Sequence, residues 1–169
     1  MSEGSHQVVE NIRLLTRLVE TSLSIEWTVE NVERFESRVA GLTFESPVFG
    51  PKRGGFKWQL VMNLRDACSS SLSLQLHKSS PAKRALVGYR FGIANTDGNL
   101  EFEDHGQMSF EIDSPRQHPT ILFNWTQMKE MKQKLFIEDR LRIECQITTL
   151  DYENIPDWTR VTARIKQDT

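Results

Sequence analysis

Apolar and polar residues alternate over most of this chain, and the first clear case is residues 22–35, which read SLSIEWTVENVERF. Every second position from residue 23 to residue 29 is apolar, and the positions between them are polar. A period of two is typical of a β-strand with one buried face and one wet face. The alternation ends at Asn31, whose side chain can hydrogen-bond its own backbone and turn the chain. The segment therefore predicts a half-buried strand followed by a turn.

The same alternation recurs further along the chain. It is found at residues 44–49, 56–64, 72–76, 87–93, 100–102, 108–112, 121–123 and 141–147. Pro47 favours an edge or a break in the first of these segments, because proline cannot donate to a strand ladder. Asp97-Gly98 predicts a tight hairpin at residues 95–99, since both residues suit positive φ angles. About eight strands at close spacing predict an all-β fold, an antiparallel β-sandwich.

Two segments depart from this pattern. Residues 6–20 have apolar side chains at three- and four-residue steps, which predicts an N-terminal helix. These positions are Val8, Ile12, Leu15 and Val19. Residues 125–134, WTQMKEMKQK, are good helix formers and predict a short helix before the last strands, with Thr126 as its cap. The chain thus divides into a helical extension at residues 1–21, a β domain at residues 22–150, and a final strand or linker at residues 151–169.

Charge and cysteine content exclude several classes of protein. The 169 residues include 21 basic and 23 acidic side chains, a net charge of -2, which is unlike a basic nucleic-acid-binding surface. No apolar run approaches the roughly 18 residues of a membrane span, and the N-terminus lacks the apolar block of a secretion signal. Cys68 and Cys145 form no disulfide framework or metal-site pattern. We therefore expect reduced thiols in a cytoplasmic or nuclear protein, with no nucleic-acid or membrane partner.

No set of residues predicts catalysis or metal binding. His77, His105 and His118 are scattered without ligand spacing. No nucleophile lies in a strand–turn–helix elbow. The glycines of residues 50–55, GPKRGG, lack the spacing of a phosphate-binding loop. We expect no enzymatic activity, no metal and no cofactor.

The order and spacing of several short motifs resemble the MATH domain, the meprin and TRAF homology fold. The motifs are Trp27-Thr28-Val29-x-Asn31-Val32, Phe44-x-Ser46-x-x-Phe49, Lys57-Trp58-x-Leu60, Leu72-Ser73-Leu74-x-Leu76, Tyr89-Arg90-Phe91-x-Ile93 and Glu138-Asp139-Arg140-Leu141-x-Ile143-x-Cys145. The likeness extends from about residue 23 to residue 147. It is greatest to the MATH domains that are joined to BTB domains in ubiquitin-ligase substrate adaptors.

The resemblance implies an eight-stranded antiparallel sandwich that binds short linear motifs in substrate proteins. In a MATH–BTB adaptor, a BTB domain, here outside these residues, would dock on a cullin–RING ubiquitin ligase. The isolated domain is expected to be monomeric and non-enzymatic. Two alternatives remain open: a TRAF-type scaffold made trimeric by the helix at residues 6–20, and the targeting domain of a larger MATH-bearing deubiquitinase.

The resemblance also locates a peptide groove in this sequence. The residues it implies are Gln75, Tyr89, Phe110, Arg116, Gln117 and His118. Gln75 replaces an aromatic residue of MATH–BTB relatives, whereas Tyr89 keeps one, and the loop before residue 119 has lost its aromatic residues. Because Arg90 and Arg116 lie near these positions in the sequence, the expected motif is polar and rather acidic.

The alternation itself predicts other roles for some aromatic residues. Trp27 and Trp58 lie on apolar strand faces and are expected in the core. Tyr89 also lies on an apolar face, so core burial and groove contact are equally compatible with its position. For Gln75, Arg116 and His118 the favoured alternative is a solvated side chain, on a strand face for Gln75 and in a loop for the other two.

Overall fold

A computed structural model describes residues 14–33, 41–52, 55–65, 70–80, 84–112 and 118–156 of this chain. The chain divides into two compact units, Glu20–Leu150 and a smaller one made of Met1–Val19 with Asp151–Thr169. In the smaller unit the described residues are β-strand, the start of β1 and the end of β9. The larger unit contains the hydrophobic core.

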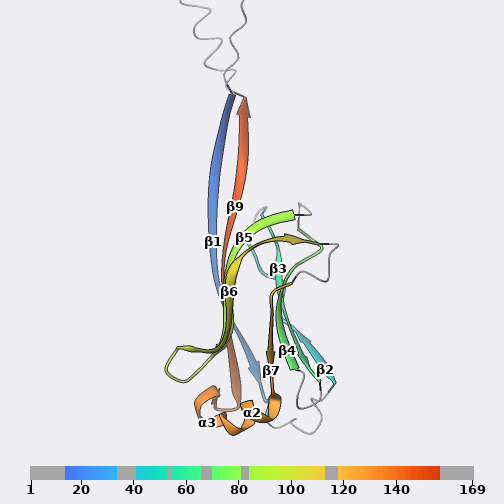
Figure 1. Cartoon of the computed structure of the whole chain (residues 1–169), viewed down its shortest axis with the longest axis vertical. Helices are drawn as coiled ribbons and strands as arrows, with labels where there is room; N and C mark the ends of the chain where they lie inside the picture. Colours follow the sequence, from blue (N-terminus) through green and yellow to red (C-terminus); the bar gives the residue numbers. More distant parts are fainter. Residues whose placement is uncertain are drawn as a thin grey trace, which may run out of the picture. The chain divides into compact units, whose positions relative to one another are not determined.

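Strands dominate the described residues. The elements are β1 (Leu14–Glu30), β2 (Leu42–Glu45), β3 (Trp58–Leu64), β4 (Ser70–Leu76), β5 (Arg84–Ala94), β6 (Leu100–Glu111), β7 (Thr120–Phe123), α2 (Trp125–Glu130), α3 (Lys132–Leu135), β8 (Phe136–Ile137) and β9 (Arg140–Pro156). A five-stranded sheet has the order β1-β9-β5-β6, with β8 paired to β9, and a four-stranded sheet has the order β2-β3-β4-β7 (Figure 1). The pairings between strands are antiparallel. This arrangement is consistent with the predicted β-sandwich.

The core lies between the two sheets and uses the predicted alternating positions. On β3 and β4 the buried residues include Trp58, Leu60, Leu72 and Leu74, and one hydrophobic cluster joins them to β5, β6 and β9. The rings of Trp58 and Phe110 meet edge to face with centroids 5.0 Å apart across the sandwich. Trp58 is therefore a core residue, as predicted. Trp27 is partly buried and packs against the same cluster.

The predicted N-terminal helix is wrong at residues 14–20, which are part of β1. Residues 6–13 of that prediction lie outside the described part of the chain. Spacing along the sequence is a local signal, whereas β1 is held by its neighbour β9, more than a hundred residues later. An isolated helix of this length is marginal in water, so a partner strand can override its periodicity.

Two strand predictions also change. Residues 100–102 and 108–112 were expected as separate strands, but β6 is continuous from Leu100 to Glu111. The residues between them, EDHGQ, carry no apolar signal, yet the pairing with β5 runs through all of them. The predicted strand at residues 44–49 ends at Glu45, two positions before Pro47.

The short helix before the last strands is confirmed, but its cap is not the predicted one. It forms as α2 and α3. The side chain of Asn124 accepts hydrogen bonds from the backbone N–H groups of Thr126 at 2.8 Å and Gln127 at 3.3 Å. Asn124 is thus the N-cap, and Thr126 lies inside the helix. No helix in the described residues is both long and apolar enough to cross a bilayer.

The hairpin predicted at residues 95–99 is present between β5 and β6. The Asn95 side-chain oxygen accepts hydrogen bonds from the N–H groups of Asp97 at 2.9 Å and Asn99 at 3.0 Å. Gly98 has a φ of 83°, which suits glycine. The buried Asn95 therefore organises the turn from within.

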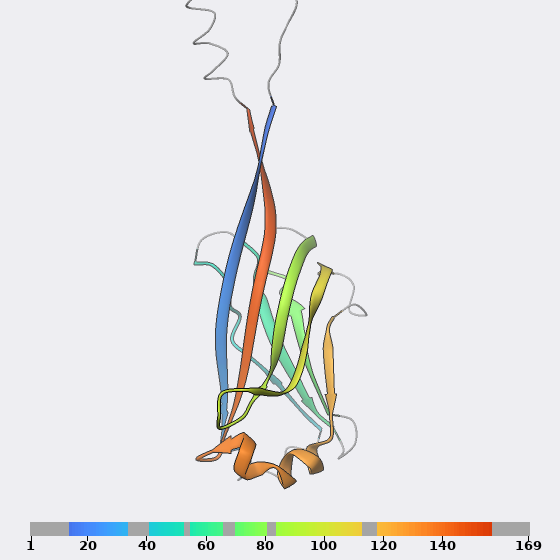
Figure 2. The same ribbon diagram turned by 60° about the vertical axis from the view of Figure 1, so that its left-hand side comes forward.

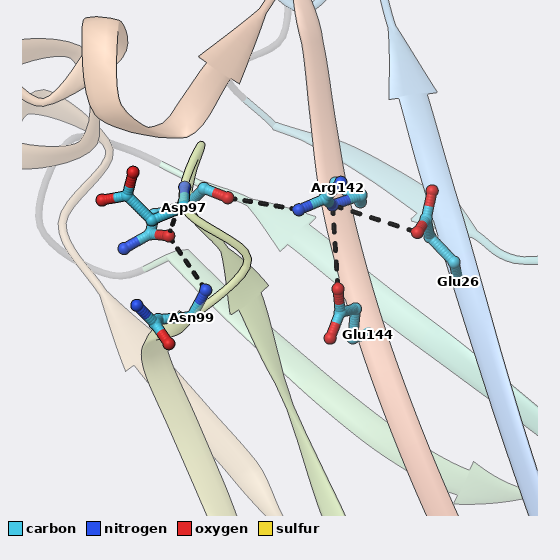
Figure 3. Close-up of polar contacts among 6 residues, drawn as sticks. Glu26, Asp97, Asn99, Arg142 and Glu144 are labelled. Atoms are coloured by element: carbon cyan, nitrogen blue, oxygen red, sulfur yellow. Dashed lines mark hydrogen bonds and ion pairs between the residues drawn. The ribbon is translucent and has the colours of Figure 1, made fainter.

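Arg142 of β9 contacts both this turn and neighbouring residues of the five-stranded sheet. Its guanidinium donates to the Asn95 carbonyl at 3.2 Å and lies 3.9 Å from Glu26 of β1 and 3.7 Å from Glu144 (Figure 3). Arg142 thus connects the turn, β1 and β9 on the outer face of the five-stranded sheet.

Candidate functional site

The two sheets end side by side at one flank of the sandwich. β6 is the last strand of the five-stranded sheet and β7 is the last strand of the four-stranded sheet. The two strands are neighbours in both views (Figures 1 and 2), and the rings of Phe102 on β6 and Phe123 on β7 lie 6.3 Å apart. Within the described residues, no further strand pairs with either of them. In the described residues, β6 and β7 therefore each have one backbone edge without a partner strand at this flank, and the contact between Phe102 and Phe123 makes the space between the two strands partly apolar.

Tyr89 of β5 points into this flank from the inner face of its sheet. It packs against the core between Phe91 and Phe110, with ring centroids 6.0 Å and 6.1 Å away. Its register partner on β6 is Gly106. A Cβ atom at Gly106 would lie 3.1 Å from the tyrosine oxygen and 3.4 Å from the adjoining ring carbon. The absence of a side chain at Gly106 thus lets the ring of Tyr89 reach across β6.

Asp104 lies beside the hydroxyl of Tyr89. The hydroxyl donates to the Asp104 carboxylate at 3.4 Å. Burial, and then the charge of Asp104 and this hydrogen bond, raise the pKa of Tyr89 above its ordinary value. Tyr89 therefore stays a neutral hydrogen-bond donor at physiological pH, with a carboxylate as its neighbour.

The nearest predicted cation, Arg90, lies on the opposite face of the sheet from Tyr89. Its side chain is exposed and pairs with Glu103 at 2.9 Å. Successive residues of a strand point to opposite faces, so Arg90 cannot contribute to the inner side where Tyr89 lies. The expected acidic motif rested on Arg90 and Arg116: Arg90 lies on the outer face, Arg116 lies outside the described residues, and the charged side chain beside the Tyr89 hydroxyl is Asp104.

Gln75 and Phe110 occupy different environments from Tyr89. Gln75 belongs to β4, on the face opposite the core residues Leu74 and Leu76, and donates to the Ser73 hydroxyl at 3.1 Å. It is therefore in the other sheet and on its outer face. Phe110 is fully buried, so in this structure it supports the ring of Tyr89 and offers no surface to a peptide.

The predicted loop before β7 is described only at its end. Arg116 and Gln117 lie outside the described residues. His118 is partly buried, its Nδ1 atom has no hydrogen-bond partner, and burial lowers the pKa of its imidazole. Of the six predicted residues, the structure brings Tyr89 and Phe110 into direct contact.

Asp104 and Gly106 were missed by the sequence predictions. A signal for them does exist, because Phe102, Met108 and Phe110 are at even-numbered positions of the same strand. Alternation through the polar stretch would have placed residues 104 and 106 on the inner face with them. Because residues 103–107 include no apolar side chain, the alternation along the strand is not apparent there.

The described residues offer no support for a metal-binding site or for a reactive thiol. No group of three or more His, Cys, Asp or Glu side chains there is close enough to hold a metal ion. Cys145 is buried, and burial raises the pKa of its thiol to about 12. A thiol with that pKa is not a nucleophile at neutral pH.

Two hollows lie outside the cluster of Tyr89, Asp104 and Gly106. One, of about 530 Å³, is lined by α2 and α3 together with Glu33 and Phe136. The other, of about 210 Å³, lies by the 95–99 turn and includes Arg90 and Glu144. Neither of these two hollows is lined by Tyr89 or Asp104.

The chain matches no model of a known protein family, and no curated protein sequence matches it.

Proposed function

We propose that this chain is a MATH-like interaction domain that binds an extended segment of another protein along the flank formed by β6 and β7. The observation that carries this proposal is the pair of unpaired strand edges, with Tyr89 reaching over Gly106 beside them. An extended peptide gains affinity from main-chain hydrogen bonds to such an edge and specificity from pockets for alternate side chains. Tyrosine suits such a position because it offers a large apolar ring and one polar group.

The ladder between β4 and β7 defines which backbone groups are available at this edge. The N–H of Leu74 donates to the carbonyl of Pro119 at 3.2 Å. In an antiparallel ladder, bonded and non-bonded pairs alternate along the strand. In the observed register, Thr120 and Leu122 therefore fall at non-bonded positions, and their N–H and C=O groups face the free side of β7. The side chain of Leu122 is 75% exposed there.

The proposed biological role is substrate recognition for a ubiquitin ligase. The strand motifs that resemble MATH–BTB adaptors support it, and so do the edges of β6 and β7, which have no paired strand within the described residues. A BTB domain outside these residues would dock on a cullin-type ligase. Dimerisation through that domain would join two weak peptide sites and raise their combined avidity.

A TRAF-type trimeric scaffold has less support. Its motivation was a helix at residues 6–20, and residues 14–20 of that segment are strand.

A proline at the free edge tests the binding mode. Leu122→Pro removes one N–H that points away from the β4–β7 ladder, so the sheet itself loses no hydrogen bond. Leu122→Ala is the matched control, because it removes the same exposed side chain and keeps the N–H. Peptides selected from a random display library on the purified chain should bind Leu122→Pro about tenfold more weakly, and Leu122→Ala nearly as well as the unaltered chain.

Two results would count against this proposal. If the library yields no peptide that binds the folded chain, the interaction function is wrong. If selected peptides bind Leu122→Pro and Leu122→Ala equally well, the edge of β7 is not where they bind.

A further inference from the structure

Asp104 is an acidic side chain on the inner face of an edge strand. Its register partner is Phe91, a fully buried core residue. The even-numbered neighbours Phe102 and Phe110 both pack in or against the hydrophobic core. Asp104 itself is only partly buried, so its carboxylate lies at the border between the core and the open flank.

Within the described residues this carboxylate has no cationic partner. Its contact there is the hydroxyl of Tyr89 at 3.4 Å, which is longer than an ordinary O–H···O hydrogen bond. The other acidic residues around it are differently placed: Glu103 pairs with Arg90 on the outer face, and Glu101 pairs with Lys134. A partly desolvated carboxylate with one weak donor is stabilised when a cation approaches it.

The ring of Tyr89 adds a second feature that favours a cation. The hydroxyl end of the ring lies over Gly106, which has no side chain to cover it. The face of an aromatic ring attracts lysine and arginine side chains, most strongly where water is partly excluded. A carboxylate and a tyrosine ring side by side therefore suit a side chain with a long apolar stem and a positive end.

Resting on the proposed peptide-binding function, we infer that Asp104 and Tyr89 form a specificity site for one lysine or arginine side chain of the bound segment. This preference is opposite in charge to the acidic motif expected from Arg90 and Arg116 in the sequence. Asp104 also has a role without a ligand, because an inward-pointing charge on an edge strand deters pairing with other strands. A segment with a basic side chain would compensate the charge of Asp104, and a neutral segment would not. The attraction of Asp104 for a cation and its deterrence of other strands therefore favour the same basic partner.

The test is a peptide selection followed by a double-mutant cycle. A random display library is selected on the purified chain and, separately, on Asp104→Lys. The unaltered chain should enrich lysine or arginine at one fixed position of the peptide, and Asp104→Lys should enrich aspartate or glutamate at that position. Binding of a selected peptide, and of its version with methionine at that position, is then measured by fluorescence anisotropy on the unaltered chain and on Asp104→Asn.

Asp104→Asn should weaken binding of the basic peptide by about tenfold and leave binding of the methionine version nearly unchanged. Glu103→Gln is the matched control, because it makes the same change of charge one residue away on the opposite face of β6. It should leave both peptides unchanged. Tyr89→Phe, which keeps the ring, should weaken the basic peptide less than Tyr89→Ala. Thermal unfolding of each variant establishes that it is folded.

The failures of the two proposals are distinguishable. If no peptide is enriched on the folded chain, peptide binding itself is overturned, and this inference with it. If peptides are enriched without a fixed basic residue, or if Asp104→Asn and Glu103→Gln have the same effect, the specificity site is overturned while the interaction function stands.

Discussion

The two glycines on one face of β5 should respond in opposite ways to the same substitution. A Cβ atom at Gly92 would lie 2.1 Å from the backbone oxygen of Phe102 and 3.0 Å from the Cα of Glu103. At Gly88, four residues earlier on the same strand, the nearest atoms are 3.9 Å away, which is ordinary van der Waals contact. Gly92→Ala and Gly88→Ala are therefore a matched pair that differs in the space available.

The contact at Gly92 cannot be relieved by turning a side chain, because the obstructing atoms belong to the backbone of β6. The register between β5 and β6 already shifts nearby, at Ile93 and Ala94. Overpacking in a core typically costs about 1–3 kcal/mol, and a lost backbone hydrogen bond adds about 1 kcal/mol. We expect Gly92→Ala to lower the free energy of unfolding by about 2–4 kcal/mol. Gly88→Ala should raise it by about 0.5–1 kcal/mol, because alanine loses less backbone entropy in a strand.

Urea denaturation followed by tryptophan fluorescence measures both effects in the same experiment. The midpoint should shift down for Gly92→Ala and slightly up for Gly88→Ala, with similar slopes. The reasoning is refuted if Gly92→Ala is as stable as the unaltered chain, or if Gly88→Ala is the more damaging of the two. Either result would mean that the close approach of β5 and β6 at Gly92 is not as described.

Three further predictions concern the cap, the buried thiol and the turn. Asn124→Ala should lower the free energy of unfolding by about 1 kcal/mol, and Thr126→Ala by much less, as measured by urea denaturation; equal losses would contradict the assigned cap. Burial raises the pKa of Cys145 from 9.0 to about 12, so the unfolded thiol loses its proton first as pH rises. Stability should therefore fall between pH 9 and 12, by up to about 1.4 kcal/mol per pH unit, and the fall should be smaller in Cys145→Ala. In a Cys68→Ser background, a thiol reagent at pH 8 should modify Cys145 only after unfolding, and rapid modification of the folded chain would contradict its burial. Asn95→Ala should destabilise by about 1–3 kcal/mol, because two backbone N–H groups of the turn lose their acceptor; an unchanged denaturation midpoint would contradict that role.

Much of the sandwich could be predicted because its signals are local. The alternation through Trp58, Leu60 and Met62 reports which side of one strand is apolar, whatever strand lies next to it. Asp97-Gly98 marks its hairpin for the same reason, since the preference for positive φ belongs to those residues themselves. The composition of residues 125–134 predicts the helix before the last strands. Its predicted cap, Thr126, lies two residues after the observed cap, Asn124.

The errors occur where a neighbour far away in the sequence decides the outcome. Residues 14–20 have helix-like spacing, but pairing with β9 makes them strand. The polar stretch from Glu103 to Gln107 looks like a loop, but pairing with β5 continues the strand through it. Arg90 is adjacent to Tyr89 in the sequence, but adjacent residues of a strand point to opposite faces of the sheet.

The amino-acid sequence by itself determined that this chain forms strands, where most of them lie and which of their faces is apolar, because those properties depend on each residue and its near neighbours. Only the tertiary structure decided which strands end the two sheets and that Asp104, Gly106 and Tyr89 meet at the open flank. That meeting depends on the register between β5 and β6 and on the packing of one sheet against the other. Both are contacts between segments far apart in the chain, and no local pattern encodes them.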